Sequence, residues 1–414
     1  MVKGHGNIKC GLIGEHLGHS FSKMIHAEIT DYSYELVELT PENVGDFVKN
    51  GKLDAFNVTI PYKKTVMPFL DRISPEAQRI GAVNTVVRRN DGTIDGYNTD
   101  YFGFDGMLNA SKIDPMGKKA VILGNGGASL TVQAVLADRG VRETVVVDLG
   151  LENNYDNIHK HFDADIIVNA TPVGMYPKNG KSLVSLDNFK SCIGVLDVIY
   201  NPSKTALLLD AERHGIKHMN GLYMLVAQAV KAYEFFTDSK AEVEIIEEIT
   251  EKIERDTKNV ILIGMPGCGK STVGRVIAEK TGREFFDGDT EFTKMHGITP
   301  AEAINTLGEN KFREMEHETL TELGKLSGKV IACGGGVVTR EYNYDVLHQN
   351  GTIVYLWREL SLLATNGRPL SQKTSPEALY NARRASYERF ADIRVDSTEI
   401  PEKTADAILK AIGY

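Results

Sequence analysis

Short apolar runs with the length and composition of β-strands recur along the chain, alternating with segments in which apolar residues are spaced as on helices. Before residue 238 these runs lie at 8–14, 34–39, 54–60, 82–88, 119–124, 144–149, 165–170 and 194–200. After residue 257 the rhythm restarts, with runs at 259–264, 283–289, 329–336 and 351–357. An alternation of this kind predicts an α/β fold with largely parallel sheets.

The segment between these two series differs in composition. Residues 238–256 contain three basic and eight acidic residues. Within it, Val243, Ile246, Ile249 and Ile253 recur at helical spacing. We therefore predict an amphipathic helix that joins two bodies and packs on one of them.

Length and composition limit the classes of protein to consider. A chain of 414 residues predicts two to four domains, and its 42% hydrophobic and 25% charged residues are typical of globular proteins. No apolar stretch approaches the roughly 18 residues of a membrane helix, and the N-terminal residues lack the apolar run of a signal peptide, so we expect a cytoplasmic protein. The formal charge of −9 argues against non-specific binding to nucleic acid or to an acidic membrane surface. Cys10, Cys192, Cys268 and Cys333 lie far apart without a CxxC pair, which argues against a disulfide framework or a zinc site.

A nucleotide-binding motif follows the first apolar run of the second series. Residues 264–271 read GMPGCGKS, which matches GxxxxGK[ST], and they lie between that run and a helical pattern at 272–282. In such a loop, backbone N–H groups cradle phosphates at a helix N-terminus. Lys270 would reach the β- and γ-phosphates, and Ser271 would ligate Mg²⁺. The motif predicts binding of ATP with Mg²⁺.

Motifs that follow in order make residues 258–414 resemble shikimate kinase. They are DGD at 287–289, KFREME at 311–316, CGGG at 333–336, GRPL at 367–370 and ARRASYERFAD at 382–392. The resemblance implies transfer of the γ-phosphoryl group of ATP to one hydroxyl of shikimate. A carboxylate substrate requires planar bidentate donors, and the resemblance assigns this role to Arg313 and Arg383; we choose Arg383 over Arg384 because it stands four residues before Tyr387.

The same resemblance assigns the remaining kinase roles. Asp289 would engage the substrate hydroxyls and accept the proton of the attacking hydroxyl, and Asp287 would support the metal through water, together with Ser271. Arg368 would be carried onto the phosphates by a mobile lid, but the segment 362–370 is short and lacks the arginine usual some seven residues earlier, so contacts to adenine are expected to differ. The expected catalytic residues are Lys270, Asp289 and Arg368. The expected ATP-binding residues are Gly264, Met265, Pro266, Gly267, Cys268, Gly269, Lys270, Ser271, Thr272 and Arg368, and the expected shikimate-binding residues are Asp289, Arg313, Gly334, Gly335, Gly336 and Arg383.

Eight motifs in order make residues 8–237 resemble shikimate dehydrogenase. They are GLIGEHLGHSFSKMIH, FNVTIPYKK, IGAVNTVV, GYNTDYFGF, ILGNGGAS, VNATPVGM, DVIYNPSKT and NGLYMLVAQAV. The resemblance implies two lobes, with a substrate-binding lobe at 1–104, completed by a returning helix at about 222–237, and a Rossmann-like NAD(P)-binding lobe at 105–221. The acidic helical linker would occupy 238–257 and the P-loop kinase domain 258–414.

A dehydrogenase must pass a proton to or from oxygen while hydride moves on carbon. The resemblance pairs Lys63, as the general acid, with Asp100, which would hold its charge and orientation. His19 lies in the same region, but we expect it to be a structural hydrogen-bonder rather than a base. The substrate-binding residues implied are Ser20, Ser22, Thr59, Lys63, Asn84, Asp100, Tyr200 and Gln228.

The apolar run 119–124, the glycine-rich turn at 124–129 and the helical pattern after it predict a dinucleotide-binding unit. NADP-using members of the resembled family usually have Asn-Arg-Thr after the next strand, whereas this chain has Asp148-Leu149-Gly150. A carboxylate there accepts from a ribose 2′-hydroxyl and repels a 2′-phosphate, which predicts a preference for NAD over NADP unless the nearby basic residues at 142 and 159–161 compensate. Only 20 residues lie between Asp148 and Asn169, room for one helix at 151–162 and a strand, so we expect a cofactor sheet smaller than usual. The cofactor-binding residues implied are Gly124, Gly126, Gly127, Ala128, Asp148, Thr171, Val198 and Gly221.

Together these patterns predict a bifunctional enzyme that reduces 3-dehydroshikimate to shikimate and then phosphorylates shikimate, with NAD or NADP, ATP and Mg²⁺ as cofactors. Small molecules are the expected partners, and a homo-oligomer is possible. Two alternatives stay open: the first half only binds shikimate as a regulatory or scaffolding module, or it prefers quinate as its substrate.

Overall fold

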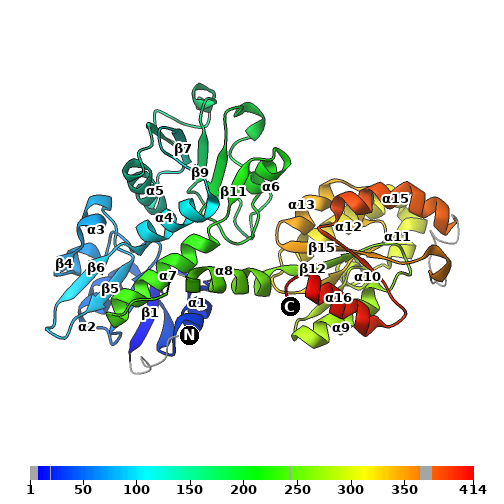
Figure 1. Cartoon of the computed structure of the whole chain (residues 1–414), viewed down its shortest axis with the longest axis horizontal. Helices are drawn as coiled ribbons and strands as arrows, with labels where there is room; N and C mark the ends of the chain where they lie inside the picture. The colour runs from blue at the N-terminus through cyan, green and yellow to red at the C-terminus, as the bar shows by residue number, and fades with distance from the viewer. Residues whose placement is uncertain (1–7, 19, 243, 364–374) are drawn as a thin grey trace. The chain divides into compact units, whose positions relative to one another are not determined.

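The computed structural model describes residues 8–18, 20–242, 244–363 and 375–414, and the chain divides into two compact units (Figure 1). Unit 1 comprises Met1–Gly174, Lys181–Tyr200 and Leu207–Ile253, and unit 2 comprises Met175–Gly180, Asn201–Ala206 and Glu254–Tyr414. Both units are built of sheets covered by helices, which confirms the predicted α/β fold. Within the described residues, none of the helices has the length and apolar character that crossing a membrane requires.

The first lobe of unit 1 contains a mixed six-stranded sheet. β1 pairs in parallel with β2 and β3, but β5 runs antiparallel to both β3 and β6. The sheets are largely parallel, as expected, and β5 is an exception: only residues 89–93 connect β5 to β6, which is too short for a parallel crossover. The strand order is β2 (Ser33–Glu38), β1 (Lys9–Gly14), β3 (Ala55–Val58), β5 (Thr85–Arg88), β6 (Ile94–Tyr97) and β4 (Arg72–Ile73).

Helices cover both faces of this sheet, and one of them comes from far along the chain. α7 (Leu222–Thr237) packs with α1 (Ser22–Ile29) and the apolar side of α8 (Glu244–Thr257) against one face. Residues of α2 (Val44–Asn50) and α3 (Pro75–Ile80) lie in the cluster on the other face. Ile246, Ile249 and Ile253 are all buried in the α8 contact, so the acidic segment forms the predicted amphipathic helix and packs on unit 1; Val243 lies outside the described residues.

The second lobe of unit 1 contains a five-stranded sheet in which every pairing is parallel. Alternate residues of its strands face α4 (Thr99–Ser111) and α5 (Gly127–Asp138) on one side and α6 (Ala206–Arg213) on the other. The strand order is β11 (Lys217–Met219), β10 (Gly194–Asp197), β9 (Ile166–Asn169), β7 (Lys119–Leu123) and β8 (Glu143–Val147).

The connection from β8 to β9 contains no strand, as its length predicted, but the helix expected at 151–162 is wrong. Only one short 3-10 turn forms there, at Ile158–His161. The amides of Asn154 and Asn157 instead donate to the backbone oxygens of Leu151 and Glu152, at 3.3 and 2.7 Å. Such local side-chain bonds compete with helical hydrogen bonds, which explains why an apolar spacing suited to a helix did not produce one.

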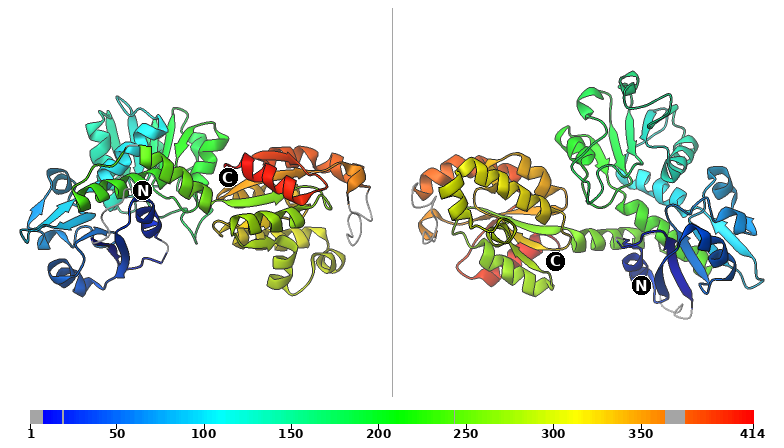
Figure 2. Two further views of the ribbon diagram at one scale, coloured as in Figure 1. Left: turned by 60° about the horizontal axis from the view of Figure 1, so that its bottom comes forward. Right: turned by 180° about the vertical axis from the view of Figure 1, so that it is seen from behind.

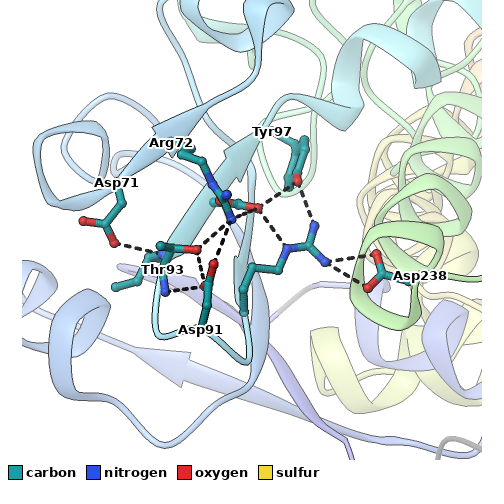
Figure 3. A network of polar contacts seen from close by, with 9 residues as sticks. Asp71, Arg72, Asp91, Thr93, Tyr97 and Asp238 are labelled. Atoms are coloured by element: carbon teal, nitrogen blue, oxygen red, sulfur yellow. Dashed lines mark hydrogen bonds and ion pairs between the residues drawn. The ribbon is translucent and has the colours of Figure 1, made fainter.

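A network of charged side chains fixes the C-terminal end of α7 to the first sheet (Figure 3). Asp95 of β6 accepts from Arg72 at 2.6 Å and from Arg89 at 2.9 Å, and Arg89 also pairs with Asp238 at 3.0 Å. Burial acts to raise the pKa of Asp95, but the arginine hydrogen bonds outweigh it and hold the pKa below its ordinary value. The network therefore joins the end of α7 to the strands β4 and β6 of the first sheet.

Unit 2 contains a five-stranded parallel sheet whose central strand leads into the glycine-rich loop. The strand order is β13 (Phe285–Asp287), β14 (Val330–Ala332), β12 (Asn259–Ile263), β15 (Gly351–Trp357) and β16 (Ile393–Asp396). α9 (Lys270–Thr281) and α16 (Pro401–Ala411) lie on one face, and α12 (Glu309–Gly324), α13 (Tyr342–His348) and α15 (Pro376–Phe390) lie on the other (Figure 1). α10 (Gly288–His296) and α11 (Pro300–Leu307) follow β13. This arrangement gathers the carboxyl ends of the strands, where ligands bind in open parallel sheets.

Candidate active sites

Lys63 and Asp100 are in direct contact in unit 1. The Nζ atom of Lys63 donates to Oδ2 of Asp100 at 2.5 Å, and the two side chains are 20% and 11% exposed. Asp100 lies in the first turn of α4, a helix capped by the side chain of Asn98. The backbone oxygen of Lys63 accepts from the amide of Val83 at 2.8 Å. The predicted ammonium–carboxylate pair is thus formed, and it retains enough exposure to meet a ligand.

A buried polar network orients two further predicted residues, Asn84 and Gln228. Oδ1 of Asn84 accepts from the backbone amide of Thr99 at 2.7 Å, so its NH₂ group is left to donate elsewhere. The hydroxyl of Thr99 is 3.4 Å from Oε1 of Gln228 and 3.0 Å from the hydroxyl of Thr85. Thr99 and Thr85 are fully buried, and they were missed because their role depends on neighbours from other elements.

The predicted serines meet at the start of α1. The hydroxyl of Ser20 donates to that of Ser22 at 3.1 Å, and Ser20 also accepts from the backbone amide of Ser22. Tyr200 reaches the same region, since its ring lies 5.1 Å from that of Phe21, and burial raises the pKa of its hydroxyl. Thr59 follows β3 directly, and its backbone amide donates to the carbonyl oxygen of Ile13 in β1. His19 lies outside the described residues.

The glycine-rich turn of the second lobe is open toward solvent. A Cβ atom added to Gly126 or Gly127 would meet nothing within 4 Å, whereas one on Gly124, where φ is 102°, would lie 2.6 Å from the side chain of Thr171. The protein's own packing therefore requires glycine only at Gly124, and the open pair fits a turn that a diphosphate approaches closely. Ala128 continues α5 beyond this pair.

Three other predicted cofactor residues lie at strand ends of the same sheet. Thr171 follows β9 and donates from its hydroxyl to Asn169 at 2.7 Å. Val198 follows β10, and a Cβ atom on Gly221 would lie 2.1 Å from its carbonyl oxygen. The turn between β11 and α7 therefore requires glycine at 221, and it places Gly221 beside Val198.

Asp148 lies against the glycine-rich turn. Its Oδ2 accepts from the amide of Asn125 at 2.9 Å, and its Oδ1 accepts from the amide of Leu149 at 2.7 Å. Arg142 precedes the opposite end of β8, six residues away, which at about 3.3 Å per residue is roughly 20 Å. His161 bonds Asn153 instead. In the part of the chain that the structure describes, no basic side chain pairs with Asp148.

In unit 2 the P-loop forms between β12 and α9. Gly264, Gly267 and Gly269 all have positive φ, at 146°, 86° and 101°. Lys270 is buried, and its Nζ donates to the carbonyl oxygens of Gly264 and Met265 at 2.9 and 3.1 Å. The loop lines a cavity of about 590 Å³ with Pro266, Thr272 and most of the other predicted kinase residues, while Cys268 is buried beneath it.

A hydroxyl and a carboxylate lie together beside the loop, where the sequence predicted the metal ligands Ser271 and Asp287. The hydroxyl of Ser271 donates to Oδ2 of Asp287 at 2.6 Å. The other oxygen of Asp287 caps α10 by accepting from the amide of Asp289. Hydroxyl and carboxylate oxygens are ligands that Mg²⁺ prefers, directly or through water, so this donor set fits Mg²⁺ beside the phosphates.

The predicted carboxylate-binding arginines line the same cavity. Arg313 pairs with Glu316 at 2.7 Å and with Glu309 at 3.2 Å; burial would lower its pKa, but these carboxylates raise it, so the guanidinium stays charged. Arg383 donates to the carbonyl oxygen of Gly335 at 3.0 Å. Arg384 instead is exposed and pairs with Glu388. Arg383, the residue chosen from the sequence, is therefore the one of the two that lines the cavity.

The glycine loop after β14 is shaped by these neighbours. A Cβ atom on Gly336 would lie within 2.4 Å of the Arg313 guanidinium, and one on Gly335 would lie 2.7 Å from Pro266. A Cβ atom on Gly334 would face Glu316 at 2.9 Å and Asp289 at 3.3 Å. The three glycines therefore let the substrate arginines, the P-loop and Asp289 approach one another.

Two charged residues that line the cavity were missed from the sequence. Glu316 holds Arg313, and its spacing of three residues on a helix was a usable signal. Arg358, after β15, lines the cavity without any motif to mark it. Arg368, assigned to the lid, lies outside the described residues.

Comparison with known proteins identifies both units. Residues 266–413 match the model of shikimate kinase, and residues 12–86 match the model of the shikimate dehydrogenase substrate binding domain. The shikimate dehydrogenase (NADP(+)) of Clostridium beijerinckii is 37% identical over 268 residues, and the match covers 60% of this chain and 98% of that protein. The chain belongs to the shikimate dehydrogenase family. It is a fusion, because a shikimate kinase domain follows the dehydrogenase unit.

Solved structures of dehydrogenases agree with this assignment. A chorismate mutase/shikimate 5-dehydrogenase fusion protein from Clostridium acetobutylicum is 39% identical, with a TM-score of 0.57, and the match covers 60% of this chain and 98% of that one. Shikimate 5-dehydrogenase from Listeria monocytogenes, solved in complex with shikimate and NAD, is 31% identical, with a TM-score of 0.53 and coverage of 59% and 96%. Both resemblances drawn from the sequence are confirmed.

Proposed function

We propose that the chain catalyses two consecutive reactions, the NAD(P)H-dependent reduction of 3-dehydroshikimate to shikimate and the ATP-dependent phosphorylation of shikimate to shikimate 3-phosphate. The observation that carries the proposal is the presence in one chain of two families whose chemistry shares shikimate. The contact between Lys63 and Asp100 and the P-loop cavity supply each unit with the groups its reaction requires.

In the dehydrogenase unit, Lys63 donates a proton to the carbonyl oxygen of the substrate as that oxygen gains negative charge. A bound nicotinamide nucleotide supplies the hydride. Asp100 fixes the ammonium group in place and keeps its charge near the reacting oxygen. Asn84, Gln228, Tyr200, Ser20, Ser22 and Thr59 read the positions of the ring hydroxyls and the carboxylate.

In the kinase unit, Asp289 accepts the proton of the attacking shikimate hydroxyl. Arg313 and Arg383 hold the carboxylate of shikimate. Lys270 and the P-loop amides neutralise the charge of the phosphates, and Ser271 and Asp287 hold Mg²⁺. ATP supplies the phosphoryl group. The contacts of Lys270 with the loop carbonyls, and of Ser271 with Asp287, support these assignments.

The direct test is a reaction with the full chain, 3-dehydroshikimate, NADPH or NADH, ATP and Mg²⁺, with the products followed by mass spectrometry. We expect shikimate to form only when a reduced nicotinamide nucleotide is present, and shikimate 3-phosphate only when ATP is added as well. Formation of neither product would contradict the proposal.

The comparisons do not favour the alternative in which unit 1 only binds shikimate, because the relatives of that unit are named as dehydrogenases. A pure binding module would have no need of the Lys63–Asp100 pair. The other alternative, a preference for quinate, is tested by measuring the rates at which the dehydrogenase unit oxidises shikimate and quinate. We expect a higher kcat/KM for shikimate.

We also propose that the dehydrogenase unit prefers NAD(H) to NADP(H). The curated relatives are named for NADP(+) and do not support this preference. Its support is the Asp148 carboxylate beside the glycine-rich turn, which forms no ion pair with any basic side chain that the structure describes. A 2′-phosphate near that carboxylate would meet a like charge, which at about 4 Å costs about 1 to 4 kcal/mol.

The measurement is kcat/KM with each nucleotide at saturating substrate, for the wild type and for Asp148→Asn/Leu149→Arg. We expect the wild type to favour NAD(H) by about tenfold and the double variant to lose or reverse that preference. Equal or better use of NADP(H) by the wild type would refute the preference and leave the two proposed reactions untouched.

A further inference from the structure

Arg358 is a cationic residue of the kinase cavity to which no role has been given. It is the first residue after β15, and β15 pairs with β12, the strand that leads into the P-loop, through Tyr355 and Ile263. A Cβ atom on Gly264 would lie 2.4 Å from the carbonyl oxygen of Leu356. The end of β15 therefore abuts the start of the P-loop, and Arg358 lines the cavity that Lys270 also lines.

Among the residues that the structure describes, the guanidinium of Arg358 forms no hydrogen bond or ion pair. Its Nε atom is buried and makes no hydrogen bond to any residue that the structure describes. The two other arginines of the cavity are engaged, since Arg313 pairs with Glu316 and Arg383 donates to Gly335. A buried donor without a partner destabilises the protein, and more so when it belongs to a charged group. A bound anion would remove that cost.

The order of strands indicates which anion this is. Asp289 and the glycine loop at 334–336 follow β13 and β14, on one side of β12, and Arg313 and Arg383 converge there. Arg358 follows β15, on the other side of β12. The P-loop, which follows β12 itself, lies between. A ligand held by the P-loop is thus closer to Arg358 than a carboxylate held by Arg313 and Arg383.

We propose that Arg358 binds the phosphates of the nucleotide in the kinase unit. Its planar fork of N–H donors matches phosphate oxygens in pairs, and Arg358 lines the same cavity as the P-loop. This inference rests on the proposed kinase function. Arg358 would then supply a further contact to the phosphates, and this contact comes from the end of a strand rather than from the short lid.

The test compares the full chain with Arg358→Ala, using calorimetric titration with ADP and, separately, with shikimate. Since hydrogen bonds to charged groups contribute about 1.5 to 3 kcal/mol, we expect the Kd for ADP to rise about tenfold or more. The Kd for shikimate should change by less than about twofold. The KM for ATP in the kinase reaction should rise together with the Kd for ADP. Arg358→Lys should restore part of the affinity, because it keeps the charge and loses the fork.

Arg384→Ala is the matched control, because Arg384 is an exposed arginine of the same unit that pairs with Glu388 and should leave both affinities unchanged. Thermal unfolding shows whether Arg358→Ala remains folded, and Arg358→Lys serves as the test variant if it does not. ADP affinity equal to that of the wild type, or an equal loss of ADP and shikimate affinity, would overturn the inference alone. A wild-type chain that fails to bind ADP would overturn the kinase function and this inference with it.

Discussion

At the scale of single residues, the ammonium of Lys63 meets the carboxylate of Asp100 at 2.5 Å, and Lys64 beside it is exposed and takes no part. Replacing Lys63 by alanine removes the proton donor but not the residues that hold the substrate ring. We expect Lys63→Ala to lower the kcat of the dehydrogenase by about 10²- to 10⁴-fold, with a smaller effect on KM. Steady-state kinetics would measure this.

Lys64→Ala is the control for this variant and should behave like the wild type. If Lys63→Ala raised KM alone and left kcat intact, Lys63 would be a binding residue and another group would carry the proton.

The residues that could be predicted from sequence are those fixed by a local motif. Lys63, Asp100 and Lys270 each belong to a short sequence motif, and the residues next to them in that motif fix where their side chains lie. Glu316 and Arg358 could not be predicted in the same way, because their roles follow from cavity walls contributed by distant strands and helices. The buried hydroxyl of Thr99 is a similar case, since it orients Asn84 and Gln228 from two other elements.

At the scale of elements, α4 and α7 run side by side and join the two lobes of the dehydrogenase unit (Figure 1; Figure 2). A Cβ atom on Gly103 of α4 would lie 2.5 Å from the backbone oxygen of Met224 on α7. Alanine normally stabilises a helix relative to glycine, but here the clash with backbone dominates. We expect Gly103→Ala to lower the free energy of unfolding of unit 1 by about 1 to 3 kcal/mol in urea.

Gly106→Ala makes the same substitution one turn later, where the nearest atom belongs to the ring of Tyr223 at 3.1 Å. Because a side chain can shift more easily than backbone, this control should cost clearly less. If both variants lowered the free energy of unfolding equally, the close approach of Gly103 to the backbone of α7 would not be the cause of the loss.

An ion pair links α3 of the first lobe with α5 of the second. Asp138 accepts from Arg79 at 2.8 and 2.5 Å and from the hydroxyl of Tyr101 at 2.6 Å, and these bonds lower the pKa of Asp138 to about 2. A carboxyl group with a lowered pKa stabilises the fold above its ordinary pKa of about 4 and loses that contribution as the pH falls toward 2. Because the pair is partly exposed, we expect Asp138→Asn to cost only about 0.5 to 1 kcal/mol at pH 7.

The pH dependence distinguishes this contribution from a general loss of packing. Urea unfolding of the wild type and Asp138→Asn should differ most above pH 5, and the difference should shrink below about pH 4. Asp156→Asn, at an exposed aspartate outside any helix or strand, should show no such trend. A difference that stayed constant down to pH 3 would contradict the role given to the pair.

Elements with an uninterrupted apolar run were predictable, whereas short polar strands were not. β7 and β12 are buried along their whole length, and the apolar pattern alone identified both. β6, with the sequence IDGY, and β16, with IRVD, become strands because a neighbouring strand pairs with them. The helix expected at 151–162 did not form, because asparagine side-chain amides donate to backbone carbonyl oxygens that would otherwise accept helical hydrogen bonds.

At the scale of the whole molecule, each unit has its own hydrophobic core and its own candidate site. Mutations at distant sites with no shared partners have independent effects. We therefore expect Lys270→Ala to abolish formation of shikimate 3-phosphate and to leave the dehydrogenase rate unchanged, and Lys63→Ala to do the reverse. Separate assays of the two reactions on each purified variant would measure this.

A mixture of these two variants then tests whether shikimate must pass directly from one unit to the other. Lys270→Ala protein releases shikimate into solution, and Lys63→Ala protein can phosphorylate it, so nothing in the proposed chemistry requires both working sites in one chain. At matched concentrations of working sites, we expect the mixture to produce shikimate 3-phosphate from 3-dehydroshikimate at a steady rate within about twofold of the wild type. A mixture that accumulates shikimate, while the wild type does not, would instead show that the fusion transfers its intermediate within the chain.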